Sequence, residues 1–208
     1  PEFDRRVLEV LRQPLESGVV TISRALRHSD FPARFQLVAA MNPCPCGYKG
    51  HASGKCHCTP DRILRYQERI SGPLLDRIDI QIEVPALGPE FMSPAADGEP
   101  SAAIAPGIAA AAQRQLARQG KPNQMLGTRE IERFCIPDAE GEEMLRRSML
   151  KFQWSARSYH RILRVARTIA DLAGACDVAS GHVSEAVGYR RALYARPADA
   201  QLQSVDDV

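Results

Sequence analysis

A proline- and glycine-rich stretch divides this sequence into two parts with different hydrophobic patterns. Residues 85–107 carry five prolines and three glycines, which is typical of a domain boundary or a mobile loop. Before this stretch, short apolar runs typical of strands alternate with helical patterns, whereas the chain after it has helical periodicity throughout. The sequence therefore predicts a partial α/β core over residues 1–84, a linker over 85–107 and an all-α domain over 108–194, followed by a disordered tail over 195–208.

The first part shows helix, hairpin and strand signals in turn. Residues 2–17 have apolar positions at helical spacing, with Pro14 expected to kink or end the helix early. Residues 19–37 read as a β-hairpin that begins with a β-branched strand. Residues 35–41 form a continuous apolar run, typical of a strand buried on both faces of a parallel sheet, and residues 78–84 alternate like a half-buried strand. Further helices are predicted over 60–70, about 108–119, 129–135, 138–151, 156–173 and 182–194.

Two polar side chains in the first part stand where a phosphate-binding site is expected. Asn42 follows the predicted buried strand, at the edge where open parallel sheets bind ligands, and its amide could orient a water or contact a phosphate oxygen. The plainer interpretation, that it only ends a strand before Pro43, stays open. Arg77 lies between Asp76 and Asp79 and could belong to a structural ion-pair network. Alternatively, it is offered in trans to a phosphate held by a neighbouring subunit.

The predicted helix over 156–173 has an apolar stripe and a basic face. Arg157, Arg161 and Arg164 recur at helical spacing near the helix start, where the helix dipole disfavours positive charge. This pattern could be a solvated face, but it also predicts an anionic neighbour, either a phosphate or an acidic side chain. The stripe comprises Ile162, Val165, Ala166, Ile169 and Ala173.

Two close cysteine pairs flank a polar loop and predict a structural metal site. The candidate ligands are Cys44, Cys46, Cys56 and Cys58. Four thiolates can hold Zn²⁺ tetrahedrally and so stiffen a loop too short to pack a core of its own. His51 and His57 are alternative ligands, and free thiols or disulfides are alternative states. Cys135 and Cys176 are expected to be ordinary buried residues on helices.

Three long motifs, in this order, resemble competence-related members of the magnesium-chelatase-like AAA+ ATPases. They read FQLVAAMNPCPCG, RYQERISGPLLDRIDI and SARSYHRILRVARTIADLAG, and the resemblance runs from Pro1 to about Leu193. It implies an α/β AAA+ (P-loop NTPase) partial core that carries a pre-sensor-1 hairpin and a cysteine-rich insertion, followed by an all-α helical lid. By the same resemblance, the protein would assemble into a ring of its own subunits.

The resemblance also implies roles for individual residues. Asn42 would be the sensor-1 residue that polarises the attacking water, and Arg77 would be the arginine finger acting on ATP in the neighbouring subunit. Arg157 would be the sensor-2 arginine of the lid, in contact with the γ-phosphate. The hairpin over 19–37 would point into the ring pore and touch DNA. Its basic tip would comprise Arg24, Arg27, His28 and Arg34.

One motif of the family is absent from this sequence. No G-x-x-x-x-G-K-[ST] phosphate loop occurs, and Ser53-Gly54-Lys55-Cys56 lacks the strand and upstream glycine that such a loop needs. The resemblance places the phosphate loop and the acidic Mg²⁺-binding motif before Pro1. We therefore expect this chain alone to bind ATP weakly or not at all, and not to hydrolyse it.

The resemblance implies an ATP- and Mg²⁺-dependent hexameric motor that acts on DNA in the cytoplasm, of the branch-migration helicase type. The net charge of +2 neither favours nor excludes nucleic acid, and no apolar run is long enough to span a bilayer. Six cysteines without a visible secretory signal indicate a reducing compartment. The alternatives are a chelatase-type motor that inserts Mg²⁺ into a porphyrin and a non-enzymatic, zinc-stabilised DNA-binding module.

Overall fold

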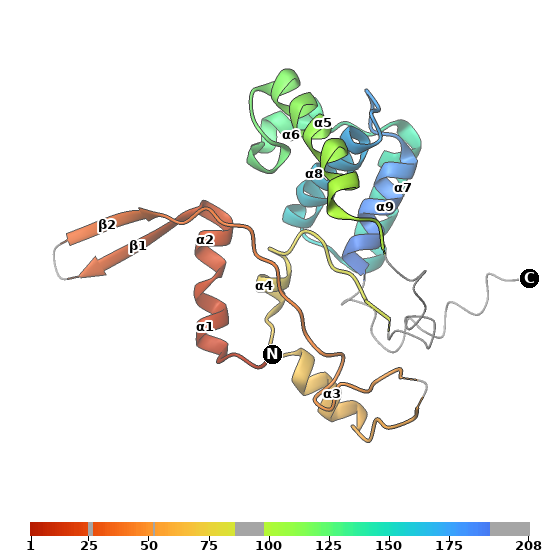
Figure 1. The fold of residues 1–208 in the computed structure, drawn as a ribbon. Coiled ribbons are helices and arrows are strands. Elements are labelled where there is room, and N and C mark those ends of the chain that lie inside the picture. The colour runs from red at the N-terminus through yellow and green to blue at the C-terminus, as the bar shows by residue number, and fades with distance from the viewer. Residues whose placement is uncertain (25–26, 52, 86–97, 192–208) are drawn as a thin grey trace, which may run out of the picture. The chain divides into compact units, whose positions relative to one another are not determined.

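The computed structural model describes residues 1–24, 27–51, 53–85 and 98–191. The chain forms two compact units that divide between Ile78 and Asp79, and each is described by itself (Figure 1). This division lies before the predicted linker over 85–107. Residues 86–97 of that linker and the whole predicted tail over 195–208 lie outside the described residues.

The first unit begins with two short helices, α1 (Arg5–Val10) and α2 (Arg12–Ser17). The single helix predicted over residues 2–17 is therefore present but broken at Leu11. Pro14 explains the break, because it has no N–H to donate to the preceding turn and is favoured in the first turn of a new helix. Gly18 ends α2 in the left-handed conformation, with φ of 68°.

The β-hairpin predicted next is confirmed. Strand β1 (Val19–Arg24) pairs antiparallel with β2 (Arg27–Pro32), in a register that runs from Val19 opposite Pro32 to Arg24 opposite Arg27. Figure 1 shows this hairpin extending away from α2. Every residue of β2 is exposed. The register pairs Val20 with Phe31, and next to them the Thr21 hydroxyl donates to Asp30 at 2.7 Å.

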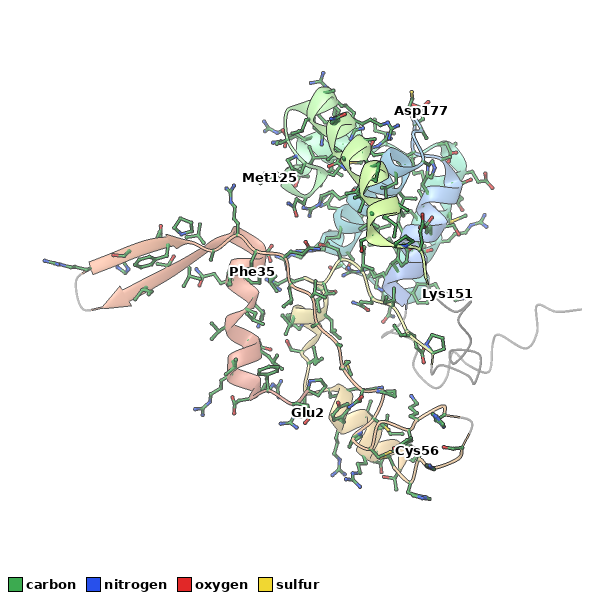
Figure 2. The ribbon with its side chains drawn as sticks, viewed as in Figure 1. Glu2, Phe35, Cys56, Met125, Lys151 and Asp177 are labelled. Carbon is green, nitrogen blue, oxygen red and sulfur yellow. The ribbon has the colours of Figure 1, made fainter. Side chains whose placement is uncertain are left out.

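The predictions of two further strands are wrong. Residues 35–41 and 78–84 contain no strand, and Val38 and Val84 are 85% and 76% exposed. Phe35 lies on the extended segment that follows β2 (Figure 2). A strand needs a neighbour to satisfy its backbone N–H and C=O groups, and no strand pairs with either segment among the described residues.

The rest of the first unit contains two capped helices. Helix α3 (Pro60–Gln67) begins at a proline, and the side chain of Thr59 accepts a hydrogen bond from the Arg62 amide. Helix α4 (Gly72–Leu75) is capped in the same way by Ser71. Helix α3 begins where the helix over residues 60–70 was predicted to begin and ends three residues earlier.

The second unit is helical, as predicted. Its elements are α5 (Ser101–Gln119), the 3₁₀ helix η3 (Asn123–Met125), α6 (Thr128–Phe134), α7 (Ala139–Phe152), α8 (Ala156–Leu172) and α9 (Ser180–Arg191). Helix α5 starts at Ser101 rather than near residue 108, so the end of the predicted linker is helical and contains Pro106. The alanine-rich turns around Pro106 favour helix strongly enough to accommodate it. Within the described residues, no helix is long and apolar enough to cross a lipid bilayer.

Helices α6 to α9 enclose the core of this unit. Leu145 of α7, Ile162 and Ala166 of α8, and Val183 of α9 are almost completely buried. Ile162 and Ala166 belong to the stripe predicted on α8, and Val165 and Ile169 of that stripe pack against the same core. Ala173, which was predicted to end the stripe, is exposed just beyond the end of α8, so the stripe is confirmed only in part.

Asp138 joins the starts of two helices. Its Oδ1 accepts a hydrogen bond from the Gly141 amide at 2.7 Å and so caps α7, and its Oδ2 accepts from the Ser180 amide at 3.0 Å at the start of α9. A side chain at Gly141 would meet Asp138 Oδ1 at 2.9 Å. Glycine is therefore required for this close approach.

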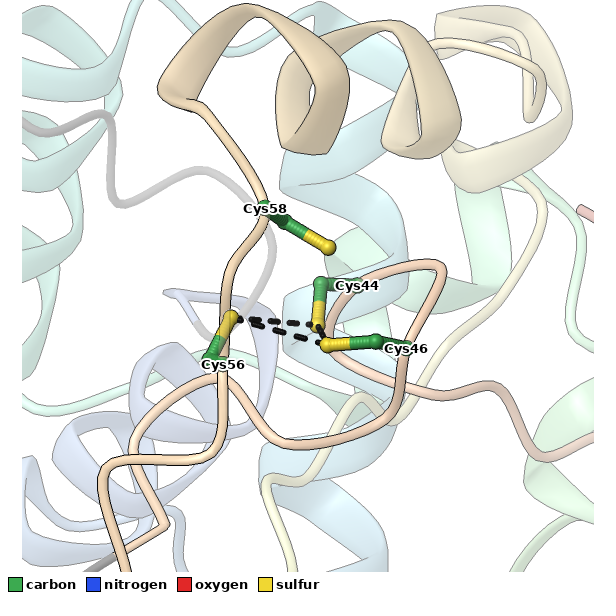
Figure 3. A group of neighbouring side chains, drawn as sticks. All are labelled: Cys44, Cys46, Cys56 and Cys58. Carbon is green, nitrogen blue, oxygen red and sulfur yellow. Dashed lines mark hydrogen bonds between the residues drawn. The ribbon is translucent and has the colours of Figure 1, made fainter.

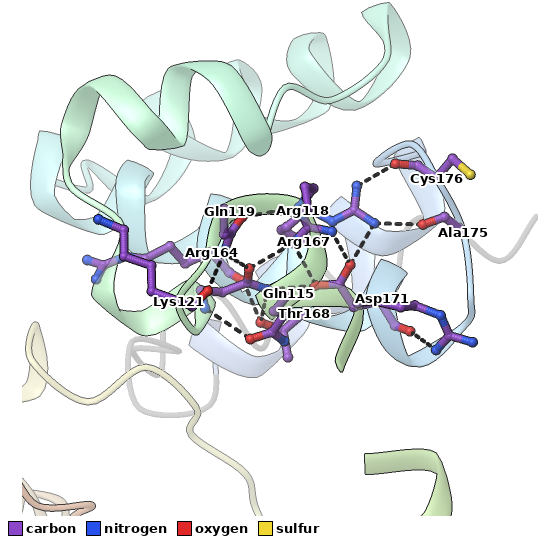
Figure 4. Close-up of polar contacts among 12 residues, drawn as sticks. Gln115, Arg118, Gln119, Lys121, Arg164, Arg167, Thr168, Asp171, Ala175 and Cys176 are labelled. Atoms are coloured by element: carbon purple, nitrogen blue, oxygen red, sulfur yellow. Dashed lines mark hydrogen bonds and ion pairs between the residues drawn. The ribbon is translucent and has the colours of Figure 1, made fainter. Parts of the chain in front are cut away.

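A buried carboxylate ties α5, η3 and α8 together (Figure 4). Asp171 is fully buried and accepts from Arg118 at 2.6 and 3.0 Å, from Asn123 at 2.9 Å and from Arg167 at 3.0 Å. Arg167 also donates to the carbonyls of Ala175 and Cys176, each at 2.7 Å. Burial raises the pKa of Asp171, but the hydrogen bonds from Arg118 and Asn123 and the charge of Arg167 outweigh it and lower the pKa.

We predict that Asp171→Asn destabilises the second unit strongly. The amide cannot balance the charges of the buried Arg167 and the half-buried Arg118, and breaking a buried ion pair typically costs about 3–5 kcal/mol. Urea unfolding followed by circular dichroism measures the loss. Glu143→Gln is the matched control, because Glu143 also pairs with two arginines, at 2.7 and 2.8 Å, but on the surface. Equal stability losses in the two variants would contradict the prediction.

The same carboxylate predicts how stability responds to acid. Since the pKa of Asp171 is lower in the folded chain, its contribution is complete above the unfolded value of about 3.9. That contribution is lost as the pH falls through the lower, folded value. We expect the free energy of unfolding of the Asp171→Asn variant to approach that of the unsubstituted chain as the pH drops below 4. A constant difference between the two at every pH would contradict this expectation.

Candidate functional site

Asn42 lies in a loop of the first unit and is exposed. It comes two residues before Cys44, and a side chain at Gly47 would lie 3.8 Å from Asn42 Cγ. Residues 35–41, directly before it, contain no strand. The amide is therefore accessible to a ligand, and its proposed sensor role stays a prediction.

Arg77 is held firmly inside the first unit. Its Nη2 pairs with Glu16 at 2.6 Å, its Nε donates to the Arg12 carbonyl at 2.9 Å and its Nη1 donates to the Pro73 carbonyl at 2.6 Å. The ion pair considered as the structural alternative is thus present, although its carboxylate belongs to Glu16 rather than to Asp76 or Asp79. The guanidinium joins α2 to α4, and its role as an arginine finger stays a prediction.

The three arginines of α8 have different surroundings within the second unit. Arg161 is buried and pairs with Asp79 at 2.5 Å, which is the acidic neighbour that the sequence allowed for. Arg164 is half-buried and donates to the Gln124 carbonyl at 3.0 Å. Arg157 is exposed in the first turn, where Ser155 caps the helix. Of these arginines, Arg157 is best placed to meet a ligand, and its sensor-2 role stays a prediction.

Sequence reasoning missed two buried arginines. Arg167 pairs with Asp171, and Arg190 donates to the Ser158 hydroxyl at 2.9 Å. The i, i+4 spacing of Arg167 and Asp171 was a usable signal for the first pair. Arg190 and Ser158 belong to different helices, so no local pattern indicated the second.

The basic residues assigned to the hairpin tip separate into two places. Arg24 and Arg27 form the last paired position before the turn, and Arg27 and His28 are exposed. The side chain of Arg24 lies outside the described residues. Arg34 follows β2 at the opposite end, where its Cγ would meet a side chain added at Gly18 at 2.8 Å. Placing Arg34 at the tip was wrong, because β2 runs on to Pro32 and carries the chain back to its base.

The four cysteines of the predicted metal site converge (Figure 3). All four sulfurs lie within 4.8 Å of one another. Cys44 Sγ is 3.3 Å from Cys46 Sγ and 3.8 Å from Cys56 Sγ, and the Cys46–Cys56 separation is 3.7 Å. Among the described residues, this group includes neither of the alternative histidine ligands.

The cluster polarises its own thiols. Burial raises the pKa of Cys44, but hydrogen bonds from Cys46 and from the backbone of Lys49 outweigh it and lower the pKa to about 6. Its hydrogen bond with Cys46, together with burial, raises the pKa of Cys58 to about 11. Within the group, the pKa of Cys44 is thus lowered, whereas the pKa values of Cys56 and Cys58 are raised.

The other two cysteines lie in the second unit. Cys135 is fully buried, as predicted, and burial raises its pKa to about 11. Cys176 is exposed in the loop between α8 and α9, so the prediction that it is buried on a helix is wrong.

Comparisons with known proteins match both parts of the chain. Residues 1–92 match the family model described as magnesium chelatase, subunit ChlI, and residues 98–190 match the model for the ChlI C-terminal region. Competence protein ComM of Haemophilus influenzae is 48% identical over 192 residues, which cover 91% of this chain and 37% of that protein.

Further relatives match over the same region. Protein YifB of Escherichia coli is 44% identical over 192 residues, covering 91% of this chain and 37% of YifB. A Mycobacterium tuberculosis protein is 35% identical over 194 residues, covering 91% of this chain and 38% of its own. The chain thus spans little more than a third of the length of these relatives. Taken together, the two family matches and these identities show that the chain belongs to the magnesium-chelatase-like family.

Proposed function

We propose that this chain is part of an ATP-driven ring motor that acts on DNA. Family membership supports nucleotide and Mg²⁺ as cofactors, and the name of the Haemophilus influenzae relative, a competence protein, supports DNA as the substrate. In this proposal the first unit is part of an AAA+ core, the helical second unit is its lid, and the ring is a cytoplasmic hexamer.

The exposed hairpin is the observation that carries the DNA proposal. Its strands bury no shared apolar face, since every residue of β2 is exposed, so core packing does not explain why this ribbon is present. Arg27 and His28 begin β2 next to the turn, and Ser23 shares a 2.7 Å hydrogen bond with His28 Nδ1. A two-stranded ribbon fits the major groove of DNA, and a basic tip is attracted to phosphates.

The chain supplies only the sensing part of the nucleotide site in this proposal. Asn42 would orient the attacking water, Arg157 would contact the γ-phosphate and Arg77 would act on the neighbouring subunit's ATP. Because Arg77 is paired with Glu16, a phosphate would have to replace this carboxylate as its partner. Such an exchange is chemically reasonable, since guanidinium binds carboxylate and phosphate with the same fork of donors.

A second candidate is a chelatase-type motor that drives Mg²⁺ into a porphyrin, which the description of the matching family favours. It requires no DNA contact. A non-enzymatic, zinc-stabilised DNA-binding module would bind DNA without ATPase. DNA-stimulated ATPase therefore separates the proposed motor from both alternatives.

We predict that Arg27→Ala in the full-length protein weakens DNA binding several-fold and lowers the slope of log affinity against log salt by about 1, because one phosphate contact is lost. Fluorescence anisotropy with labelled duplex and single-stranded DNA at several salt concentrations measures both quantities. Arg129→Ala is the control, since Arg129 is an exposed arginine of α6 in the second unit. Unchanged DNA binding by the Arg27 variant would count against the hairpin, and no DNA binding by the full-length protein would favour the chelatase reading.

We also predict that Arg77→Ala lowers ATP turnover by the full-length ring by about 10³-fold or more, the range for lost arginine fingers. Glu16→Gln is the matched control, because it removes the carboxylate partner and leaves the guanidinium in place. Turnover is measured beside the melting temperature of each variant. If Glu16→Gln abolishes turnover as completely as Arg77→Ala, the ion pair rather than a phosphate contact accounts for the effect.

A further inference from the structure

We propose that Cys44, Cys46, Cys56 and Cys58 bind one structural Zn²⁺ ion through four thiolates. The geometry of the sulfurs is the main argument. Zinc–sulfur bonds of about 2.3 Å in a tetrahedron place the sulfurs about 3.8 Å apart, and the separations of 3.3, 3.7 and 3.8 Å are close to this value. Cys58 completes the group, with its sulfur within 4.8 Å of the other three.

Neither disulfides nor simple burial explains this convergence. Disulfides join sulfurs in pairs at about 2.05 Å, whereas three of these sulfurs are nearly equidistant and all four cysteines are free. Free cysteines usually gather in apolar interiors. Only Cys44 is buried here, while Cys46 is exposed and the other two are half-buried.

The backbone around the cluster is arranged to stabilise negative sulfur. The amides of Cys46 and Lys49 donate hydrogen bonds to Cys44, and the Cys58 amide donates to Cys56. Such N–H to sulfur contacts orient metal-bound thiolates and offset their charge. Gly47 makes the first turn possible, with φ of 81° and its amide bonded to the Cys44 carbonyl at 3.0 Å.

The histidines of the loop have other contacts. His51 Nδ1 accepts from the Ser53 amide at 3.0 Å, and its ring packs edge-on against Tyr48 at 5.8 Å. His57 is exposed and belongs to no ligand group among the described residues. The geometry therefore points to four sulfur ligands with no open position, which is the arrangement of a structural zinc site rather than a catalytic one.

The position of the loop shows what the metal would hold. Cys58 is followed directly by Thr59, the cap of α3, and Gln67 Nε2 donates to the Pro43 carbonyl at 3.2 Å. The described part of residues 43–59 contains no helix or strand. A metal would fix this loop against α3 and so position Asn42, which precedes it. The inference does not depend on the motor proposal.

The test measures metal in the whole chain purified in reductant. We expect inductively coupled plasma mass spectrometry to find about one zinc ion per unsubstituted chain. The Cys44→Ser and Cys58→Ser variants should contain little zinc. Cys176→Ser is the matched control, because this exposed thiol lies outside the cluster, and it should keep its zinc. His51→Ala and His57→Ala should keep it too. Replacing zinc with Co²⁺ adds a readout of the ligands, since four thiolates give intense sulfur-to-cobalt absorption.

A cysteine substitution could lose zinc simply because the chain fails to fold. A measurement on the unsubstituted chain distinguishes this from the loss of a ligand. Removing its zinc with a chelator should expose four more thiols to a thiol reagent, and returning zinc should protect them again. The proposal would be overturned if the purified chain contained no metal and all its surface thiols reacted before any chelator was added. Iron in place of zinc, disulfides within the cluster in reductant, or loss of metal on substituting either histidine would also overturn it.

Discussion

The buried Asp171 carboxylate is the interaction on which the helical unit depends. A carboxylate that is buried away from water needs several hydrogen-bond donors. Here the donors are Arg118 of α5, Asn123 of η3 and Arg167 of α8. The ends of α5 and α8 and the turn between α5 and α6 are therefore fixed by one charge. The apolar residues of α7 and α9 supply the core beside it, but this network specifies how the helices meet.

Arginine pairing is the common theme of both units. Arg77 holds α2 to α4 through Glu16 in the first, and Arg161 holds the segment after Asp79 to α8 in the second. Guanidinium groups that suit a phosphate also suit a carboxylate. The proposed motor would use this equivalence, because a residue that stabilises one subunit alone could change partner when a neighbour's nucleotide arrives.

The hairpin and the cysteine loop are the parts of the first unit that core packing does not explain. Each exposes polar side chains and has its own stabilising device, the antiparallel ladder in one and four converging sulfurs in the other. A metal supplies to a short loop the rigidity that a large domain takes from its apolar core. Both features are therefore suited to contacts with something outside the chain or to positioning Asn42.

Local sequence signals were enough to predict most of the helices, the hairpin and the four cysteines that converge. Caps such as Ser155, the break before Pro14 and the paired cysteines all act over a few residues. Tertiary structure alone decided the partners of Arg77 and Arg161, which lie 61 and 82 positions away in sequence. It also decided that residues 35–41 and 78–84 are not strands. An apolar pattern shows only that a segment could be buried as a strand, whereas the strand forms only where a neighbouring strand satisfies its backbone N–H and C=O groups.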